Sequence, residues 1–270
     1  MSKFSSKNKL IEKQLKQLNK KEEKLTLEKE PGIIKNKLDP LKTKIEEKIP
    51  EKLQSTLNIA FEKGFKTVFD KGIGIIEKTY NKEDINMEFD INSYAINKYP
   101  TKRNLKKIDK SANKKTFINK SVSAIEGGAL GLLGIGIPDI PIYIGVILKS
   151  IYEISLSYGF DYNFPEERIY ILNIICSSVT SGTERKMYFN KLDTIANEID
   201  NGKYHNYNID ETLKETSSKI STYMLTSKFI QGLPIVGVVG GVTNFKTLHD
   251  ISTIAKLKYK QRYLNKLLIW

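Results

Sequence analysis

The chain is poor in the residues that enzymes use for nucleophilic and metal chemistry. It has one cysteine, Cys176, and two histidines in 270 residues. A single cysteine cannot form an intramolecular disulfide, so we expect a reducing compartment and a small buried side chain at Cys176. No GxSxG, HExxH or P-loop pattern is present. The sequence therefore predicts no metal and no cofactor, and offers only Asp139 as a candidate general acid or base.

Targeting signals are also absent from the sequence. Residues 1–24 lack the apolar core and cleavage site of a signal peptide, Ser2 stands where myristoylation requires glycine, and the last residues carry no prenylation motif. We therefore expect a cytoplasmic protein, one that would meet a membrane peripherally and from its inner face.

Arginine is scarce, although the chain is strongly basic. The net charge is +13, and only four of the 44 basic residues are arginine. A positive field favours anionic partners such as phospholipid headgroups, nucleic acid or acidic proteins. Base readout and bidentate phosphate binding rely on arginine, and no zinc-finger or leucine-zipper spacing is present. The composition therefore disfavours nucleic acid as the partner.

The positive charge is concentrated beside an apolar segment. Residues 98–120 contain nine Lys or Arg against the single acid Asp109, and residues 122–148, rich in glycine and apolar side chains, follow directly. Such a pattern is expected at an anionic membrane surface, where each cation contributes about 1 kcal/mol. It also fits a charged surface that leads into a buried core. The cations predicted to face a membrane are Lys102, Arg103, Lys106, Lys107, Lys110, Lys114 and Lys115.

Helical periodicity dominates the chain, because apolar residues recur every three or four positions and strand-like alternation is scarce. The pattern predicts an all-α fold with a Lys/Glu-rich N-terminal arm, helical or disordered, over residues 1–38 and one helical domain over residues 39–270. Within the domain we expect helices at 51–79, from about 117 to 137, and at 139–158, 165–180, 183–200, 209–228 and 242–264, with 81–97 as a polar connector and a loop after Pro100.

Two of these helices are rich in glycine and follow a proline. Gly136-Ile137-Pro138 resembles Gly232-Leu233-Pro234, so the sequence predicts that the two helices pack against each other at the centre of the fold. The prolines at 138 and 141 divide the apolar run 127–148 into two arms, each too short to cross a bilayer. We therefore expect a helical hairpin, either buried in the core or inserted shallowly into a membrane.

Several motifs occur in an order that is characteristic of one family. They are Gly127-Gly128-Ala129-Leu130-Gly131, Pro138-Asp139-Ile140-Pro141, Tyr158-Gly159-Phe160-Asp161, Pro165-Glu166-Glu167, Lys228, Leu233-Pro234-Ile235-Val236-Gly237, Asn244 and Arg262-Tyr263-Leu264. Over about residues 45–266 the chain resembles the EcsC protein family, named for a bacterial protein encoded beside an ABC transporter. The resemblance implies an all-helical protein without a settled biochemical activity. By analogy it also implies a link to membrane transport or secretion, with an ABC transporter as one partner.

The resemblance draws attention to four positions that could bind a ligand or partner. Asp139 could act as a buried acid or base, or could cap the helix that begins at Ile140. Asn244 could bind a substrate, or could hydrogen-bond a neighbouring helix. Lys228 and Arg262 could clamp a phosphate or carboxylate, or could pair with acids at helix ends.

Two functions follow from these observations. The first is a non-enzymatic helical protein that associates peripherally with the inner membrane face, or with a membrane transport or secretion complex. The alternative is an enzyme or small-ligand-binding protein that uses a cleft formed by Asp139, Asn244 and Arg262. The alternative requires those three side chains to converge on one pocket.

Overall fold

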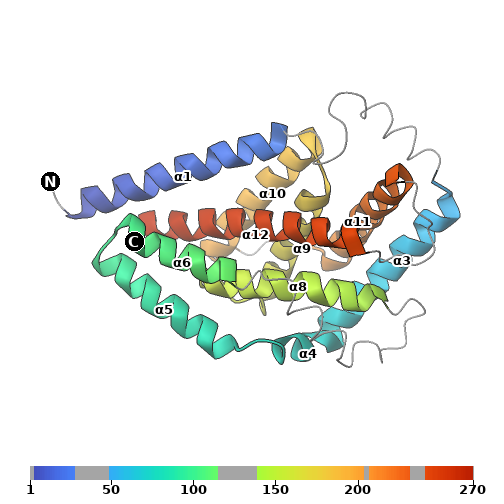
Figure 1. Ribbon diagram of the computed structural model, residues 1–270, viewed down its shortest axis with the longest axis horizontal. Coiled ribbons are helices and arrows are strands. Elements are labelled where there is room, and N and C mark those ends of the chain that lie inside the picture. Colours follow the sequence, from blue (N-terminus) through green and yellow to red (C-terminus); the bar gives the residue numbers. More distant parts are fainter. Residues whose placement is uncertain (1–2, 28–48, 115–138, 204–206, 232–240, 270) are drawn as a thin grey trace.

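The computed structural model describes residues 3–27, 49–114, 139–203, 207–231 and 241–269, and these ranges form helices without strands (Figure 1). This confirms the predicted all-α fold. The helices are α1 (Lys3–Leu27), α3 (Glu51–Thr67), the π-helical turn η1 (Val68–Gly72), α4 (Ile73–Glu77), α5 (Lys82–Lys98), α6 (Lys102–Lys114), α8 (Asp139–Ser157), α9 (Pro165–Val179), α10 (Gly182–Asp200), α11 (Ile209–Gln231) and α12 (Gly241–Ile269).

Helix α8 is the centre of the core, and α3, α5, α6 and α12 all pack against it. Its residues are apolar on nearly every side, a composition that favours complete burial of a helix. Tyr152 stacks on Tyr162 with ring centroids 3.9 Å apart. The helix ends before Gly159, whose φ of +78° suits glycine and whose Cβ, if present, would lie 2.2 Å from the Phe89 ring.

Helices α8 and α12 run in the same direction through the core (Figure 1). The hydroxyls of Ser150 and Ser252 hydrogen-bond at 2.8 Å, and further along the rings of Tyr158 and Tyr263 lie 6.3 Å apart. The predicted central pairing of these helices is therefore confirmed for their described residues. The glycine-rich sequences that precede them lie outside the described residues, as does the first arm of the predicted hairpin.

The region predicted as one helix over residues 51–79 is interrupted by the π-helical turn η1. Its apolar stripe is buried as expected, including Phe61 and Phe65 at 0% exposure. Gly64 permits the close helix contact that a glycine inside a helix predicts. A Cβ there would lie 2.7 Å from Ile144 Cδ1 and 3.0 Å from Ile140 Cγ2, both on α8.

The polar connector predicted over residues 81–97 is wrong, because this segment is helix α5. The Asn81 side chain caps its start by accepting a hydrogen bond from the Asp84 N–H at 3.1 Å. Ile85, Asn92 and Ile96 form a narrow buried stripe against the core. The loop after Pro100 is shorter than predicted, because α6 already begins at Lys102.

The N-terminal arm is helical over residues 3–27 and packs along α12 and α10. Ile11 is buried, and polar contacts join the arm to the domain. Glu22 accepts a hydrogen bond from Lys258, and the Leu25 carbonyl accepts one from Arg185 at 2.9 Å. The described part of the arm is therefore helical, which is one of the two forms expected from the sequence. Residues 28–38 lie outside the described residues.

The side chain of Cys176 is fully buried on α9, as predicted, with Sγ 3.3 Å from the Thr216 hydroxyl. Burial raises the pKa of the thiol to about 12. We therefore expect no reaction with Ellman's reagent at about pH 8 in the native protein, because the thiolate is the reactive form. In urea the thiol regains a pKa of about 8.5 and should react stoichiometrically. Rapid labelling without denaturant would contradict this prediction.

Candidate functional site: the α6 cationic face and the Arg262 cluster

The solvent side of α6 carries cations along its whole described length. Leu105, Ile108 and Ala112 are buried against the core, at 4% exposure or less. At 100° per residue the basic positions fall on the opposite side of the helix. We call this surface the α6 cationic face, and it consists of the exposed residues Lys102, Arg103, Lys106, Lys107 and Lys110.

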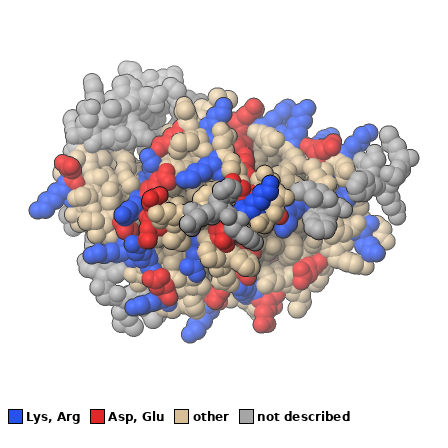
Figure 2. Space-filling model, turned by 180° about the vertical axis from the view of Figure 1, so that it is seen from behind, with Lys and Arg blue, Asp and Glu red and all other residues tan. Residues whose placement is uncertain are grey.

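The cations of the α6 cationic face are not held in ion pairs in the described part of the chain. Within the described part of the chain, none of its five cations has an ion-pair partner within 4.0 Å. The single acid of α6, Asp109, lies on the inner side and accepts a hydrogen bond from Lys260 at 2.7 Å. In contrast, the face shown in Figure 2 has basic and acidic side chains interspersed. The positive charge predicted from the sequence is therefore available to an external partner.

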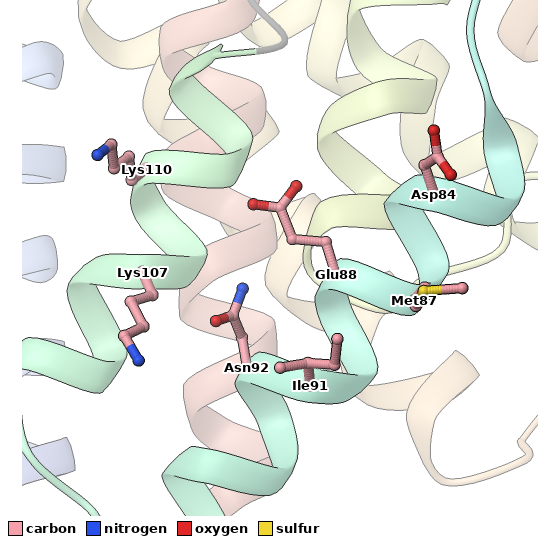
Figure 3. Close-up of a pocket in the computed structure, with 7 residues that line it drawn as sticks. All are labelled: Asp84, Met87, Glu88, Ile91, Asn92, Lys107 and Lys110. Atoms are coloured by element: carbon pink, nitrogen blue, oxygen red, sulfur yellow. The ribbon is translucent and has the colours of Figure 1, made fainter.

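A shallow groove of about 430 Å³ lies between α5 and α6 (Figure 3). Two cations of α6 and two acids of α5 line it, together with exposed apolar side chains of α5. The lining residues are Asp84, Met87, Glu88, Ile91, Asn92, Lys107 and Lys110. Because both charge signs are present, the groove does not resemble a site built for one small anion.

Arg262 on α12 lies in a buried cluster that joins three helices. Its Nη1 donates to both carboxylate oxygens of Glu167 on α9, at 2.9 and 2.8 Å. Its Nε and Nη2 donate to the two oxygens of Asp200 on α10, at 2.8 and 2.9 Å. The guanidinium also lies over the rings of Phe160 and Tyr170, with centroids 4.2 and 5.0 Å away.

This geometry uses nearly all the hydrogen-bonding capacity of Arg262. A guanidinium has five N–H donors, and the two carboxylates engage four of them. One donor is left for an external phosphate or carboxylate. The arrangement favours a structural role, in which Arg262 fixes α9 and α10 against α12, over the ligand clamp considered from the sequence.

Burial and ion pairing shift the pKa values of the cluster in opposite directions. Burial raises the pKa of Glu167, while the charge and hydrogen bonds of Arg262 act in the other direction. The Tyr259 hydroxyl also donates to Glu167, at 2.8 Å. Burial alone would lower the pKa of Arg262, but the two carboxylates raise it above its usual range. The cluster therefore keeps a charged arginine inside the fold.

A second buried cation lies one helical turn before Arg262. The Lys258 side chain has no exposed surface, and its Nζ lies 2.9 Å from both Glu22 on α1 and Asp193 on α10. Burial raises the pKa of Asp193, and Lys258 opposes this shift. Lys266 lies 3.9 Å from Asp200, so Lys258, Arg262 and Lys266 form a row on α12 that is paired with acids of α1, α9 and α10. A small depression of about 110 Å³ lies beside this row.

Two of the predicted cleft residues lie far apart along one helix. Asn244 and Arg262 lie on the same continuous helix, and 18 residues correspond to about 27 Å along its axis. The backbone of Asp139 begins α8, and the backbone of Lys228 lies near the end of α11. The side chains of Asp139, Lys228 and Asn244 lie outside the described residues, as do Lys115 and the side chain of Lys114. The backbone therefore holds Asn244 and Arg262 far apart on α12.

Sequence reasoning missed Glu167, Asp200 and Lys258 as members of buried ion pairs. The sequence indicates Glu167 only as an acid at the start of a helix, and it does lie in the first turn of α9. A signal was available in the cations of α12 at positions 258, 262 and 266, spaced at four residues on one helix face. The acids that pair with them come from other helices, so local sequence carries no sign of the pairing.

Comparison with known proteins places the chain in a family. The family model described as the EcsC protein family matches residues 12–264. The chain belongs to the EcsC protein family. It is 27% identical over 230 residues to Protein EcsC of Bacillus subtilis (strain 168), covering 84% of this chain and 85% of that protein. It is 26% identical over 155 residues to Uncharacterized protein YdbA of the same organism, covering 53% of each. No solved structure gives a significant match.

The described residues of this EcsC family member include one helix long and apolar enough to cross a membrane, Ile140–Ser157. Within the fold, 89% of that segment is buried, which is typical of a core helix in a soluble domain. Among the described residues, no three His, Cys, Asp or Glu side chains are arranged to hold a metal ion.

Proposed function

We propose that this EcsC family protein is a non-enzymatic helical protein that binds peripherally to an anionic membrane surface through the α6 cationic face. The observation that carries the proposal is the set of five exposed cations on one side of α6 without ion-pair partners among the described residues. Anionic lipids give the cytoplasmic leaflet a negative surface potential. We therefore propose the inner face of the cell membrane as the surface that the protein meets.

The shape of α6 supports electrostatic docking rather than deep insertion. The apolar side chains of α6 pack inside the fold and are unavailable to lipid. Five cations near the surface would together contribute about 5 kcal/mol at low ionic strength. Such an attraction is weakened by salt, because the Debye length falls to about 8 Å at physiological ionic strength.

Association with a membrane transport or secretion complex is a second form of the same proposal. The family resemblance carries it by analogy alone. A complex with an acidic cytoplasmic surface would meet the same α6 cationic face. The enzyme or small-ligand alternative receives no support from the described geometry, because Asn244 and Arg262 lie far apart on α12.

Vesicle co-sedimentation of the purified full chain tests the proposal. We expect binding to vesicles that contain phosphatidylglycerol, little binding to pure phosphatidylcholine, and release at high salt. Absence of binding to the anionic vesicles at low salt would overturn it. A DNA duplex of matched charge is a useful competitor. If DNA binds far more tightly than the vesicles, nucleic acid becomes the favoured partner and the membrane proposal fails.

A further inference from the structure

Exposed apolar side chains are concentrated on α5 and the turn that follows it. Of the eight large hydrophobic residues that are most exposed in the described part of the chain, four lie between residues 87 and 99. Met87, Ile91 and Tyr94 follow a helical spacing of four and three residues, so they share the outer face of α5. They are 61% to 65% exposed, and Tyr99 is 67% exposed.

The second half of this surface is aromatic and cationic, and it lacks acids. No Asp or Glu occurs between Ile91 and Ile108, and the same stretch has five cations. We define the α5–α6 tip as its exposed residues nearest the turn: Ile91, Tyr94, Lys98, Tyr99, Lys102 and Arg103. Figure 1 shows the α5–α6 turn at the left edge of the molecule, beside the C-terminal end of α12.

The turn is held in a fixed conformation, which prepares the tip for binding. The Asn104 side chain donates hydrogen bonds to the carbonyl oxygens of Tyr99 at 2.8 Å and Ala95 at 3.3 Å. The Thr101 hydroxyl caps α6 by accepting a hydrogen bond from the Asn104 N–H at 3.2 Å. Because these contacts already order the backbone, little conformational entropy is lost when the tip meets a partner.

The acids of α5 lie on the side of the tip that is farther from the α5–α6 turn. All four precede Ile91, and the last of them, Asp90, is eight residues or about 12 Å before Lys98 along the helix. If α5 stands steeply on an anionic surface, Asp90 therefore lies farther from that surface than Lys98 and Tyr99 do.

We propose that the α5–α6 tip is the edge of this protein that enters the headgroup region of an anionic bilayer. Tyr94 and Tyr99 would lie at the interface, where the amphipathic tyrosine ring is favoured, and Ile91 would lie beside them. Lys98, Lys102 and Arg103 would contact lipid phosphates. This inference rests on the proposed function and adds to it the apolar contact and the orientation of the docked protein.

The test uses tryptophan fluorescence at the tip. Trp270 is the single tryptophan of the chain, so a Trp270→Phe background is silent. In that background we expect Tyr99→Trp to give a blue-shifted emission with phosphatidylglycerol vesicles, and quenching by brominated acyl chains. The matched control is Met187→Trp on α10, at a site that is 51% exposed. We expect no shift in the emission of the Met187→Trp variant. An equal blue shift in the Met187→Trp and Tyr99→Trp variants would overturn the proposed orientation.

A second variant removes the apolar contact and leaves the charge unchanged. We expect Tyr94→Ser with Tyr99→Ser to weaken vesicle binding roughly tenfold or more, with the same dependence on salt. Binding equal to the wild type would overturn the inference. If the wild type binds anionic vesicles but the emission of the Tyr99→Trp variant stays unchanged, the tip proposal fails while the proposed function stands.

Two further outcomes would show that the tip does not enter a bilayer. If the wild type binds no anionic vesicle, the proposed function fails and the tip proposal fails with it. A blue shift that grows with protein concentration without lipid, accompanied by a dimer mass in light scattering, would show that a second copy covers the tip. That result would also overturn the membrane assignment.

Discussion

Replacing Lys102, Arg103, Lys106, Lys107 and Lys110 with glutamine is expected to lower the affinity for anionic vesicles by about three orders of magnitude at low salt. Each cation near the surface contributes about 1 kcal/mol, and a tenfold change in affinity corresponds to about 1.4 kcal/mol. Glutamine is polar and uncharged and has a helix propensity close to that of lysine and arginine, so the fold should be retained. Co-sedimentation over a range of lipid concentrations measures the effect.

A matched control changes the same amount of charge elsewhere. Lys63, Lys71, Lys186, Lys203 and Lys214 are exposed, and no ion pair is found for them among the described residues. Their replacement with glutamine lowers the net charge equally. If both variants lose affinity to the same degree, the net charge of the chain governs binding, and the α6 cationic face has no special role.

The Arg262→Ala variant is expected to lose about 3–5 kcal/mol of unfolding free energy. Removal of one partner of a buried ion pair leaves the other charge without compensation. Here Glu167 is 2% exposed and would keep only the hydrogen bond from Tyr259. Urea unfolding followed by circular dichroism measures the change, seen as a lower midpoint with an unchanged slope.

Two companion variants sharpen this result. Lys266→Ala removes a cation that is 44% exposed and 3.9 Å from Asp200. This variant should therefore lower the unfolding free energy by at most about 1 kcal/mol. Glu167→Gln combined with Arg262→Met should recover part of the loss, because both buried charges are removed together. If Arg262→Ala unfolds at the same urea concentration as the wild type, the cluster does not stabilise the fold. Arg262 would then be a candidate for ligand binding.

Periodicity was sufficient to predict helices in which apolar residues are frequent. The predicted helix 139–158 and the observed α8, Asp139–Ser157, differ by one residue, because its composition and the following Gly159 both indicate the boundary. The same method failed for α5, where only a narrow stripe is apolar and the remaining residues are polar. Its helical state depends on burial of that stripe against α8, which the local composition does not reveal.

The two parts of the candidate site differ in how far the sequence predicts them. The cations of α6 lie close together in sequence, so their sign and density are visible without a structure. Their exposure follows from the amphipathic pattern, since Leu105 and Ile108 must face the core. In contrast, the partners of Arg262 lie 62 and 95 residues away in sequence. No periodicity links residues at such distances.

The sequence by itself therefore determined the all-α fold, the membership of the EcsC protein family that the ordered motifs suggest, and the positive charge of residues 98–110. These are local properties of the chain, set by side-chain type and helical spacing. Only the tertiary structure decided that Arg262 is held between Glu167 and Asp200, and that the exposed side chains of α5 adjoin the cations of α6. Contacts of this kind depend on how helices pack, because packing joins residues that are distant in the chain.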